Sequence, residues 1–168
     1  MKKLLFLFCL LSWSVLHAQK TINRPPFIAK ATETIEIAAI HLSDTATVVD
    51  VDAKFIPKNW IRIAPATCLV ADNGERYQVR QGVGIELGQE FWMPESGEAT
   101  FYLIFPPLPA SVKSFDFVEG EGERDFNLFG ISLIGKLPKL QLPKDLGKAG
   151  KATAVALPTP EIKEDRKS

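Results

Sequence analysis

The sequence predicts an all-β protein with a single antiparallel β-sandwich of about eight strands between residues 32 and 135. Three observations lead to this prediction. Apolar and polar residues alternate at a period of two, turn residues recur roughly every 8 to 12 positions, and no segment between residues 32 and 134 has the 3.6-residue periodicity of a helix. A closed barrel is the alternative that this pattern leaves open.

The first strands are predicted from strict alternation. In residues 32–42, Ile35 and Ile37 share one face and polar residues occupy the other. The segment 45–56 repeats the pattern, with Val49, Val51, Ala53 and Phe55 on one face and Asp50, Asp52 and Lys54 on the other. Residues 59–65 place two isoleucines on one side and a tryptophan and an arginine on the other. We therefore expect three half-buried strands in this part of the chain.

The strongest hairpin signal lies in residues 68–81. Asn73-Gly74 separates two β-type runs there, and this dipeptide suits the positive φ angles of a type I′ turn. Residues 82–87 then predict a short strand or a bulged segment, and residues 98–105 a central strand rich in aromatic and branched side chains. The prolines that follow this last run end it, because proline cannot donate a hydrogen bond to a ladder.

The last two strands are predicted in residues 114–119 and 125–134, on either side of an acidic segment. Together these elements predict a sandwich that is immunoglobulin-like in its architecture. The cysteine pair of immunoglobulin domains is absent, so the prediction depends on the number and spacing of strands alone.

The two ends of the chain have different compositions from the middle. Residues 1–18 combine two lysines, an apolar run and a small residue, Ala18, which is the order of a secretory signal peptide. A retained membrane anchor is disfavoured because the apolar run is shorter than the roughly 20 residues that a spanning helix needs. We expect an exported protein, periplasmic, secreted or on the cell surface, with no transmembrane segment after cleavage and with residues 19–31 as a lead-in to the sandwich.

The net charge of zero hides an asymmetry. Residues 19–135 carry 10 Lys and Arg against 16 Asp and Glu, a net charge of −6, whereas residues 136–168 carry 8 against 4, a net charge of +4. Residues 136–168 also contain scattered prolines and no aromatic residue, which predicts a flexible tail. An acidic folded domain disfavours nucleic acid as a partner, because phosphate binding needs the opposite sign.

Residues that could carry catalysis are sparse. After signal cleavage the chain has one histidine, His41, and one cysteine, Cys68, whose apolar neighbours indicate a buried, inert thiol. One imidazole and one thiol do not make the usual zinc ligand set, and no phosphate-binding glycine motif occurs. We predict no cofactor and a non-enzymatic protein that binds an unidentified protein or cell-envelope component.

Two further sets of residues are candidates for function. The exposed-aromatic candidates for ligand binding are Trp60, Phe91, Trp92 and Tyr102, each of which could equally be a core residue. The alternative function is a glycan-acting enzyme, in which Glu90, Glu95 or Glu98 would supply the paired carboxylates of glycoside hydrolysis.

The segment SFDFVEGEGERDF, residues 114–126, contains a cluster of carboxylates. They are Asp116, Glu119, Glu121, Glu123 and Asp125. The cluster lacks the order of an EF-hand loop, so a weak calcium site is the minor interpretation. The glycines between the carboxylates favour the solvated tip of a hairpin.

The runs FWMPESGEATFYLIFPPLP, SFDFVEGE and FGISL, together with WIRIAPATCLVADNGERYQVRQGVGIEL, resemble a domain of exported bacterial proteins. The resemblance covers roughly residues 30 to 135. The family domain is uncharacterised and often stands N-terminal to a thioredoxin-like disulfide-reductase domain. The resemblance implies a β-sandwich accessory module, with an accessory role to a thiol–disulfide redox protein as one alternative, and it supplies no catalytic residues.

The chain departs from this family in two respects. It has no C-x-x-C motif, so the reductase activity of longer relatives does not transfer. Relatives carry a cysteine pair in the loop that here reads EGEGERDF, which puts a redox role of this loop in doubt.

Overall fold

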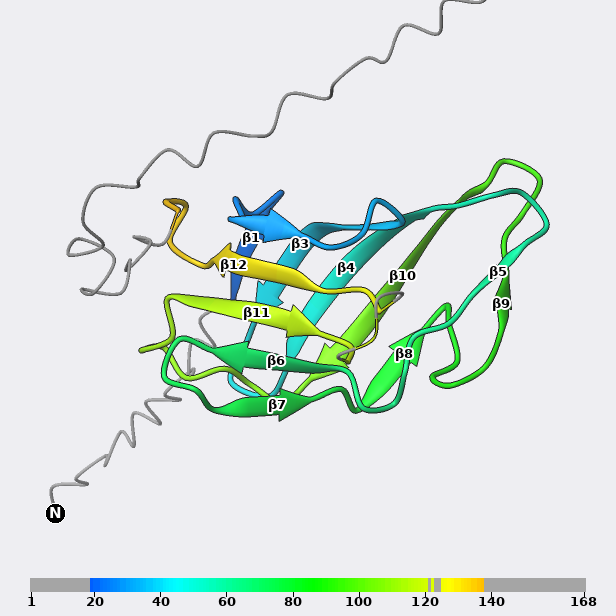
Figure 1. Ribbon diagram of the computed structural model, residues 1–168. Coiled ribbons are helices and arrows are strands. Elements are labelled where there is room, and N and C mark those ends of the chain that lie inside the picture. Colours follow the sequence, from blue (N-terminus) through cyan, green and yellow to red (C-terminus); the bar gives the residue numbers. More distant parts are fainter. Residues whose placement is uncertain (1–18, 121, 123–124, 138–168) are drawn as a thin grey trace, which may run out of the picture. The chain divides into compact units, whose positions relative to one another are not determined.

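The computed structural model describes residues 19–120, 122 and 125–137, which form two five-stranded antiparallel sheets packed face to face (Figure 1). The predicted signal peptide and most of the predicted tail lie outside these residues. Sheet A has the order β1-β3-β4-β10-β8 and sheet B the order β2-β12-β11-β6-β7. The strands of sheet A are β1 (Lys20–Asn23), β3 (Ile35–Leu42), β4 (Thr47–Lys54), β10 (Glu98–Phe105) and β8 (Gln81–Val83). Those of sheet B are β2 (Ala29–Lys30), β12 (Leu128–Ser132), β11 (Ser114–Val118), β6 (Cys68–Ala71) and β7 (Arg76–Gln78).

The predicted all-β antiparallel sandwich is confirmed. No helix occurs among the described residues, every strand pair there is antiparallel, and the two sheets are separate and open at their edges. The closed-barrel alternative is therefore wrong, because closure would join the edge strands of the sheets. The finer likeness to immunoglobulin domains stays a prediction. In the part of the chain that the structure describes, no helix is long and apolar enough to cross a membrane.

The core lies between the two sheets and follows from the alternation in the sequence. On β4, Val49 and Val51 are fully buried, and on β10, Phe101, Leu103 and Phe105 are too. β10 pairs with β4 over its whole length and with β8 on its other side, so it is central as predicted.

Sheet B closes the core from the opposite side. Phe115 and Phe117 on β11 point inward, and the Phe117 ring meets Phe105 of sheet A edge-to-face, with centroids 6.4 Å apart. This geometry is one that aromatic pairs prefer. The two rings therefore join the sheets at the centre of the core.

The β6–β7 hairpin is present where Asn73-Gly74 predicts it, but its turn type differs. The amide of Gly74 donates to the carbonyl of Ala71 (2.8 Å), and the amide of Ala71 donates to the carbonyl of Glu75 (2.8 Å). Gly74 has a positive φ of 85°, whereas Asn73 does not. A type I′ turn needs positive φ at both residues, so the prediction of that type is wrong. The loop is the three-residue kind, a turn followed by a glycine bulge.

The structure extends the sandwich further toward the N-terminus than the sequence predicts. Residues 19–31, expected as a lead-in, contain β1 and β2, which pair with β3 in sheet A and β12 in sheet B. Both are edge strands with mostly exposed side chains, so they lack the alternation by which the inner strands are recognised. The lead-in thus contributes an edge strand to each sheet.

A third, small sheet lies at one end of the sandwich. β5 (Trp60–Ile61) and β9 (Phe91–Trp92) pair only with each other and form a two-stranded ribbon (Figure 1). β5 lies in the connection from β4 of sheet A to β6 of sheet B, and β9 lies in the connection from β8 to β10 of sheet A.

Candidate binding surface

The ribbon formed by β5 and β9 has one inward and one outward face. Trp60 lies directly opposite Trp92, and Ile61 lies opposite Phe91. Directly opposed residues of an antiparallel pair project to the same side, so each of these pairs shares a face. Ile61 is buried, and the Phe91 ring lies 6.4 Å from the ring of core residue Phe101. The inward face therefore anchors the ribbon, and the outward face presents two indoles.

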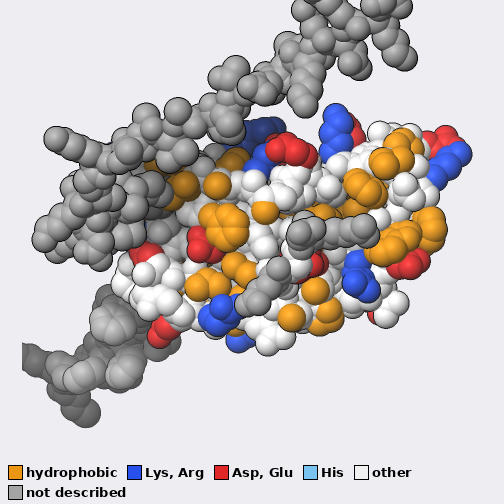
Figure 2. Space-filling view, in the orientation of Figure 1, with side chains coloured by type: hydrophobic (Ala, Val, Ile, Leu, Met, Phe, Trp, Pro, Cys, Tyr) orange, Lys and Arg blue, Asp and Glu red, His pale blue; other side chains and the backbone are white. Residues whose placement is uncertain are grey.

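The outward face is exposed to solvent. Trp60 is 42% exposed and Trp92 is 60% exposed, and Ile56, just before β5, is 58% exposed. Figure 2 shows hydrophobic side chains gathered at the end of the molecule where β5 and β9 lie. Single exposed apolar residues are normal, but a contiguous apolar patch marks an interaction site. We call Ile56, Trp60 and Trp92 the ribbon patch.

Backbone hydrogen bonds hold the ribbon in place. The amide of Met93 donates to the carbonyl of Asn59 (2.8 Å), and the amide of Phe55 donates to the carbonyl of Gly97 (2.9 Å). Met93 is also buried, which adds a third anchor to those of Ile61 and Phe91. The ribbon patch thus lies on a supported element, as an effective binding site requires.

A groove of about 760 Å³ adjoins Trp60, a size typical of ligand sites. Three segments line it: the residues just before β3, the chain around β5, and the loop after β11. The lining residues are Ala31, Thr32, Glu33, Thr34, Phe55, Asn59, Trp60, Ile61, Arg62, Ala64, Glu119, Asp125 and Phe126. The ribbon patch and this groove together form the candidate binding surface.

The structure brings together two of the four aromatic residues that the sequence singles out. Trp60 and Trp92 are paired and exposed on the ribbon. Phe91 is half-buried and packs against the core. Tyr102 is 43% exposed on β10, where it lies opposite Val83 of β8 in sheet A, away from the ribbon sheet. Their predicted binding role stays a prediction for all four.

Glu119 is not part of a solvated hairpin tip, contrary to the interpretation of the acidic segment. It is 8% exposed, and its carboxylate accepts hydrogen bonds from the amides of Ala64 (Oε1, 2.7 Å) and Phe126 (Oε2, 2.8 Å). Its own amide donates to Oδ1 of Asn127 (2.9 Å). Burial raises the pKa of Glu119, while the two amide hydrogen bonds act in the opposite direction. The carboxylate ties the β5–β6 connection to the loop after β11.

Two other carboxylates of the acidic segment accept hydrogen bonds from glycine amides. Asp116 accepts a hydrogen bond from the amide of Gly130 (2.6 Å), and Asp125 accepts one from the amide of Gly122 (2.7 Å). Glu121 and Glu123 lie outside the described residues. Among the residues that the structure describes, no three His, Cys, Asp or Glu side chains are grouped to hold a metal ion.

The carboxylates considered for glycan hydrolysis lie at the surface. Glu95 pairs with Lys58 (3.0 Å), and Glu98 pairs with Lys54 (3.0 Å). Glu90 is also exposed. The role of these carboxylates in glycan hydrolysis stays a prediction.

The sequence analysis does not predict a series of polar contacts on the outer face of sheet A, which joins Thr21, His41 and Asp50. His41 on β3 contacts the hydroxyl of Thr21 on β1 through Nδ1 (3.0 Å) and Oδ2 of Asp50 on β4 through Nε2 (3.0 Å). A register shift between Ile37 and Ala39 makes this possible, because it reverses the alternation and turns His41 outward. The sequence IEIAAIHL carries that signal, since its buried isoleucines occupy positions 35, 37 and 40. These contacts link three adjacent strands, β1, β3 and β4.

Cys68 is buried, as its apolar neighbours predict. The sequence shows no cation next to it, yet the pairing of β6 with β7 brings Arg76 close, and Nη2 of Arg76 donates to Sγ (3.1 Å). A thiol with 4% residue exposure is shielded from redox partners.

Comparisons with protein-family models, with curated proteins and with solved structures gave no match. The fold and the surface define the protein as an antiparallel β-sandwich with a two-stranded ribbon that exposes two tryptophans.

Proposed function

We propose that the protein is an exported, non-enzymatic binding module of the bacterial cell envelope, located in the periplasm, and that the ribbon patch is its contact surface. The observation that carries this proposal is the cross-strand pair Trp60–Trp92, which faces solvent on a ribbon whose opposite face is anchored in the core. Exposed tryptophans on a rigid element supply large contact area at little conformational cost, which is why interfaces are enriched in them.

The apolar and polar parts of the surface favour a macromolecular partner. The ribbon patch adjoins the groove through Trp60, which lines it, so an extended partner can contact both. The N-terminal residues, with the order of a signal peptide, support export. The resemblance to accessory domains of exported bacterial proteins supports a thioredoxin-like protein as one class of partner.

Site-specific photo-cross-linking in a bacterium that exports the full chain tests the proposal. A benzoylphenylalanine at position 92 should cross-link to a discrete periplasmic partner, and so should one at position 60. Position 102, equally aromatic and 43% exposed, is the matched control and should give no product. Cross-links from position 102 alone, or a chain that fractionates with the cytoplasm, would overturn the proposal.

A further inference from the structure

The groove beside Trp60 is part of a longer acidic surface. A second hollow of about 630 Å³ shares Glu33 and Thr34 with it and continues over the ends of β3, β4 and β10. The carboxylates that line the two hollows are Glu33, Glu36, Asp52, Glu98, Glu119 and Asp125, and the cations in the same linings are Lys54 and Arg62. Lys30, which is not part of either lining, pairs with Glu33 and Glu36, and the carboxylates still outnumber the cations when this lysine is included.

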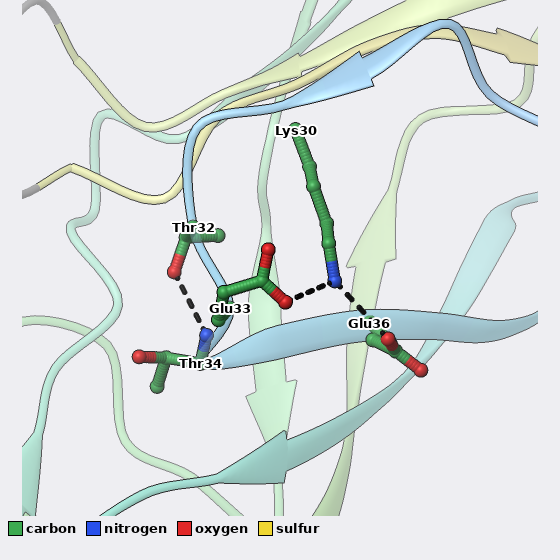
Figure 3. A network of polar contacts seen from close by, with 5 residues as sticks. All are labelled: Lys30, Thr32, Glu33, Thr34 and Glu36. Atoms are coloured by element: carbon green, nitrogen blue, oxygen red, sulfur yellow. Dashed lines mark hydrogen bonds and ion pairs between the residues drawn. The ribbon is translucent and has the colours of Figure 1, made fainter.

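This surface already holds one ammonium group of the protein itself. Nζ of Lys30 lies 2.7 Å from Oε2 of Glu33 and 3.2 Å from Oε1 of Glu36, and Figure 3 shows the lysine reaching between the two carboxylates. These hydrogen bonds raise the pKa of Lys30. The Lys30 side chain is 18% exposed, so these two carboxylates stabilise a cation that is largely shielded from solvent.

Aromatic side chains line the same groove. Trp60 is exposed there, and Phe55 and Phe126 are half-buried. A guanidinium or ammonium group is attracted to the face of an aromatic ring, most strongly to tryptophan. Carboxylates and an indole in one groove thus complement a cation, whereas an anion would meet Arg62 as the sole described cation of this groove.

The distribution of the carboxylates distinguishes among cationic ligands. They are spread over two adjoining hollows rather than gathered at one point, and they come from several segments of the chain. A single amine would use one of these positions. An extended peptide with several basic residues places cations at successive positions, since a strand rises about 3.3 Å per residue.

We propose that the two hollows form one docking groove for an extended, arginine- or lysine-containing peptide segment of a partner, with a basic side chain against Trp60. This inference rests on the proposed binding function, since it names the chemistry of the partner at the same surface. Glu33 and Glu36 contribute the negative potential, and Trp60 contributes the apolar contact.

Isothermal titration calorimetry of the full chain tests the inference with three blocked heptapeptides. The probes are Gly-Arg-Gly-Arg-Gly-Arg-Gly, the same peptide with citrulline for each arginine, and the same peptide with glutamate for each arginine. Citrulline keeps the shape of arginine and removes its charge. We expect the arginine peptide to bind at least tenfold more tightly than the citrulline peptide, and binding to weaken as salt rises.

Protein variants locate the binding. The double variant Glu33→Gln/Glu36→Gln should weaken binding of the arginine peptide several-fold, and Glu86→Gln, which removes an exposed charge outside both hollows, should leave it unchanged. No binding of the arginine peptide at millimolar concentration overturns the inference, and so does equal weakening by the double variant and Glu86→Gln. Equal binding of the arginine and citrulline peptides that is lost in Trp60→Ala overturns the basic-peptide inference while leaving the binding function in place.

Discussion

Two aromatic pairs of this protein, Phe105–Phe117 and Trp60–Trp92, show what strand alternation can and cannot determine. All four residues lie on β-strands. The phenylalanine pair lies between the two sheets, one ring from each, and both residues are fully buried. The tryptophan pair is on a ribbon with one packed face, and the other face meets solvent. The first pair serves stability, and the second is available for binding.

The largest expected effect is on the core pair. Phe117→Ala removes a fully buried ring and leaves a cavity between the sheets, which costs about 3–5 kcal/mol in the free energy of unfolding. Urea denaturation measures the loss. Phe117→Leu is the matched control and should retain most of the stability, because it keeps most of the apolar volume. A loss below about 1 kcal/mol for the alanine variant would mean that the two sheets do not meet at this ring.

Glu119 links the β5–β6 connection to the loop after β11, and its removal should have the next largest effect. Glu119→Ala leaves the amides of Ala64 and Phe126 without their acceptor, and each unpaired buried amide costs about 1–3 kcal/mol. We expect a combined loss of about 2–3 kcal/mol, because water entering the cavity compensates in part. Glu95→Ala, which removes a largely exposed carboxylate paired with Lys58, is the control and should be near neutral. Equal stability of the two variants would contradict the role of Glu119 as a link between loops.

Gly97 shapes the return from the ribbon to β10. Its φ is +70°, and a Cβ atom built there would lie 2.6 Å from the carbonyl oxygen of Phe55. Gly97→Ala should therefore destabilise by about 1–2 kcal/mol. Gly74→Ala, also at positive φ but with open space around it, separates the cost of φ from that of the close contact. A smaller effect at position 97 than at position 74 would show that the ribbon can shift away.

The pH dependence of stability tests the effect of burial on the pKa of Glu119. Burial raises its pKa above the ordinary value of 4.5, so the folded state binds this proton more tightly than the unfolded state does. The stability contributed by the proton is fully present below pH 4.5 and is lost as pH rises through the folded pKa. The stability of the native protein relative to Glu119→Gln should hence fall over this interval in urea titrations. A relative stability that rises with pH would mean that the two amide hydrogen bonds outweigh desolvation.

Alternation predicts which residues of β4, β10 and β11 are buried, because each of these strands has one face on the core and one away from it. It does not predict β1 and β2, whose edge positions impose little alternation. The register shift in β3 is the other limit. The spacing of the buried isoleucines indicates this shift, but the contact of His41 with Asp50 depends on the pairing of β3 with β4.

The candidate surface was predictable in part. The sequence singles out Trp60 and Trp92 as aromatic residues that could be either exposed or core, and only the pairing of β5 with β9 places them side by side. It also treats Glu119 as one of several solvated carboxylates, because the acidic segment contains glycines. The burial of this side chain depends on Ala64, 55 positions earlier in the chain, which supplies one of its two hydrogen bonds. Such long-range contacts have no local signature.

The smallest expected effect on stability is at the ribbon patch. Trp92→Ala removes a side chain that is 60% exposed, and we expect a change within about 0.5 kcal/mol, since exposed positions seldom contribute more. The same variant should abolish the partner cross-link formed through position 60, because Trp92 shares the outward face with Trp60. Phe91→Ala is the matched control on the same strand. It should destabilise by more than 1 kcal/mol, because its ring packs on Phe101 and anchors the ribbon. If Trp92→Ala destabilised as strongly as Phe91→Ala, both faces of the ribbon would be structural, and the contrast between the two aromatic pairs would disappear.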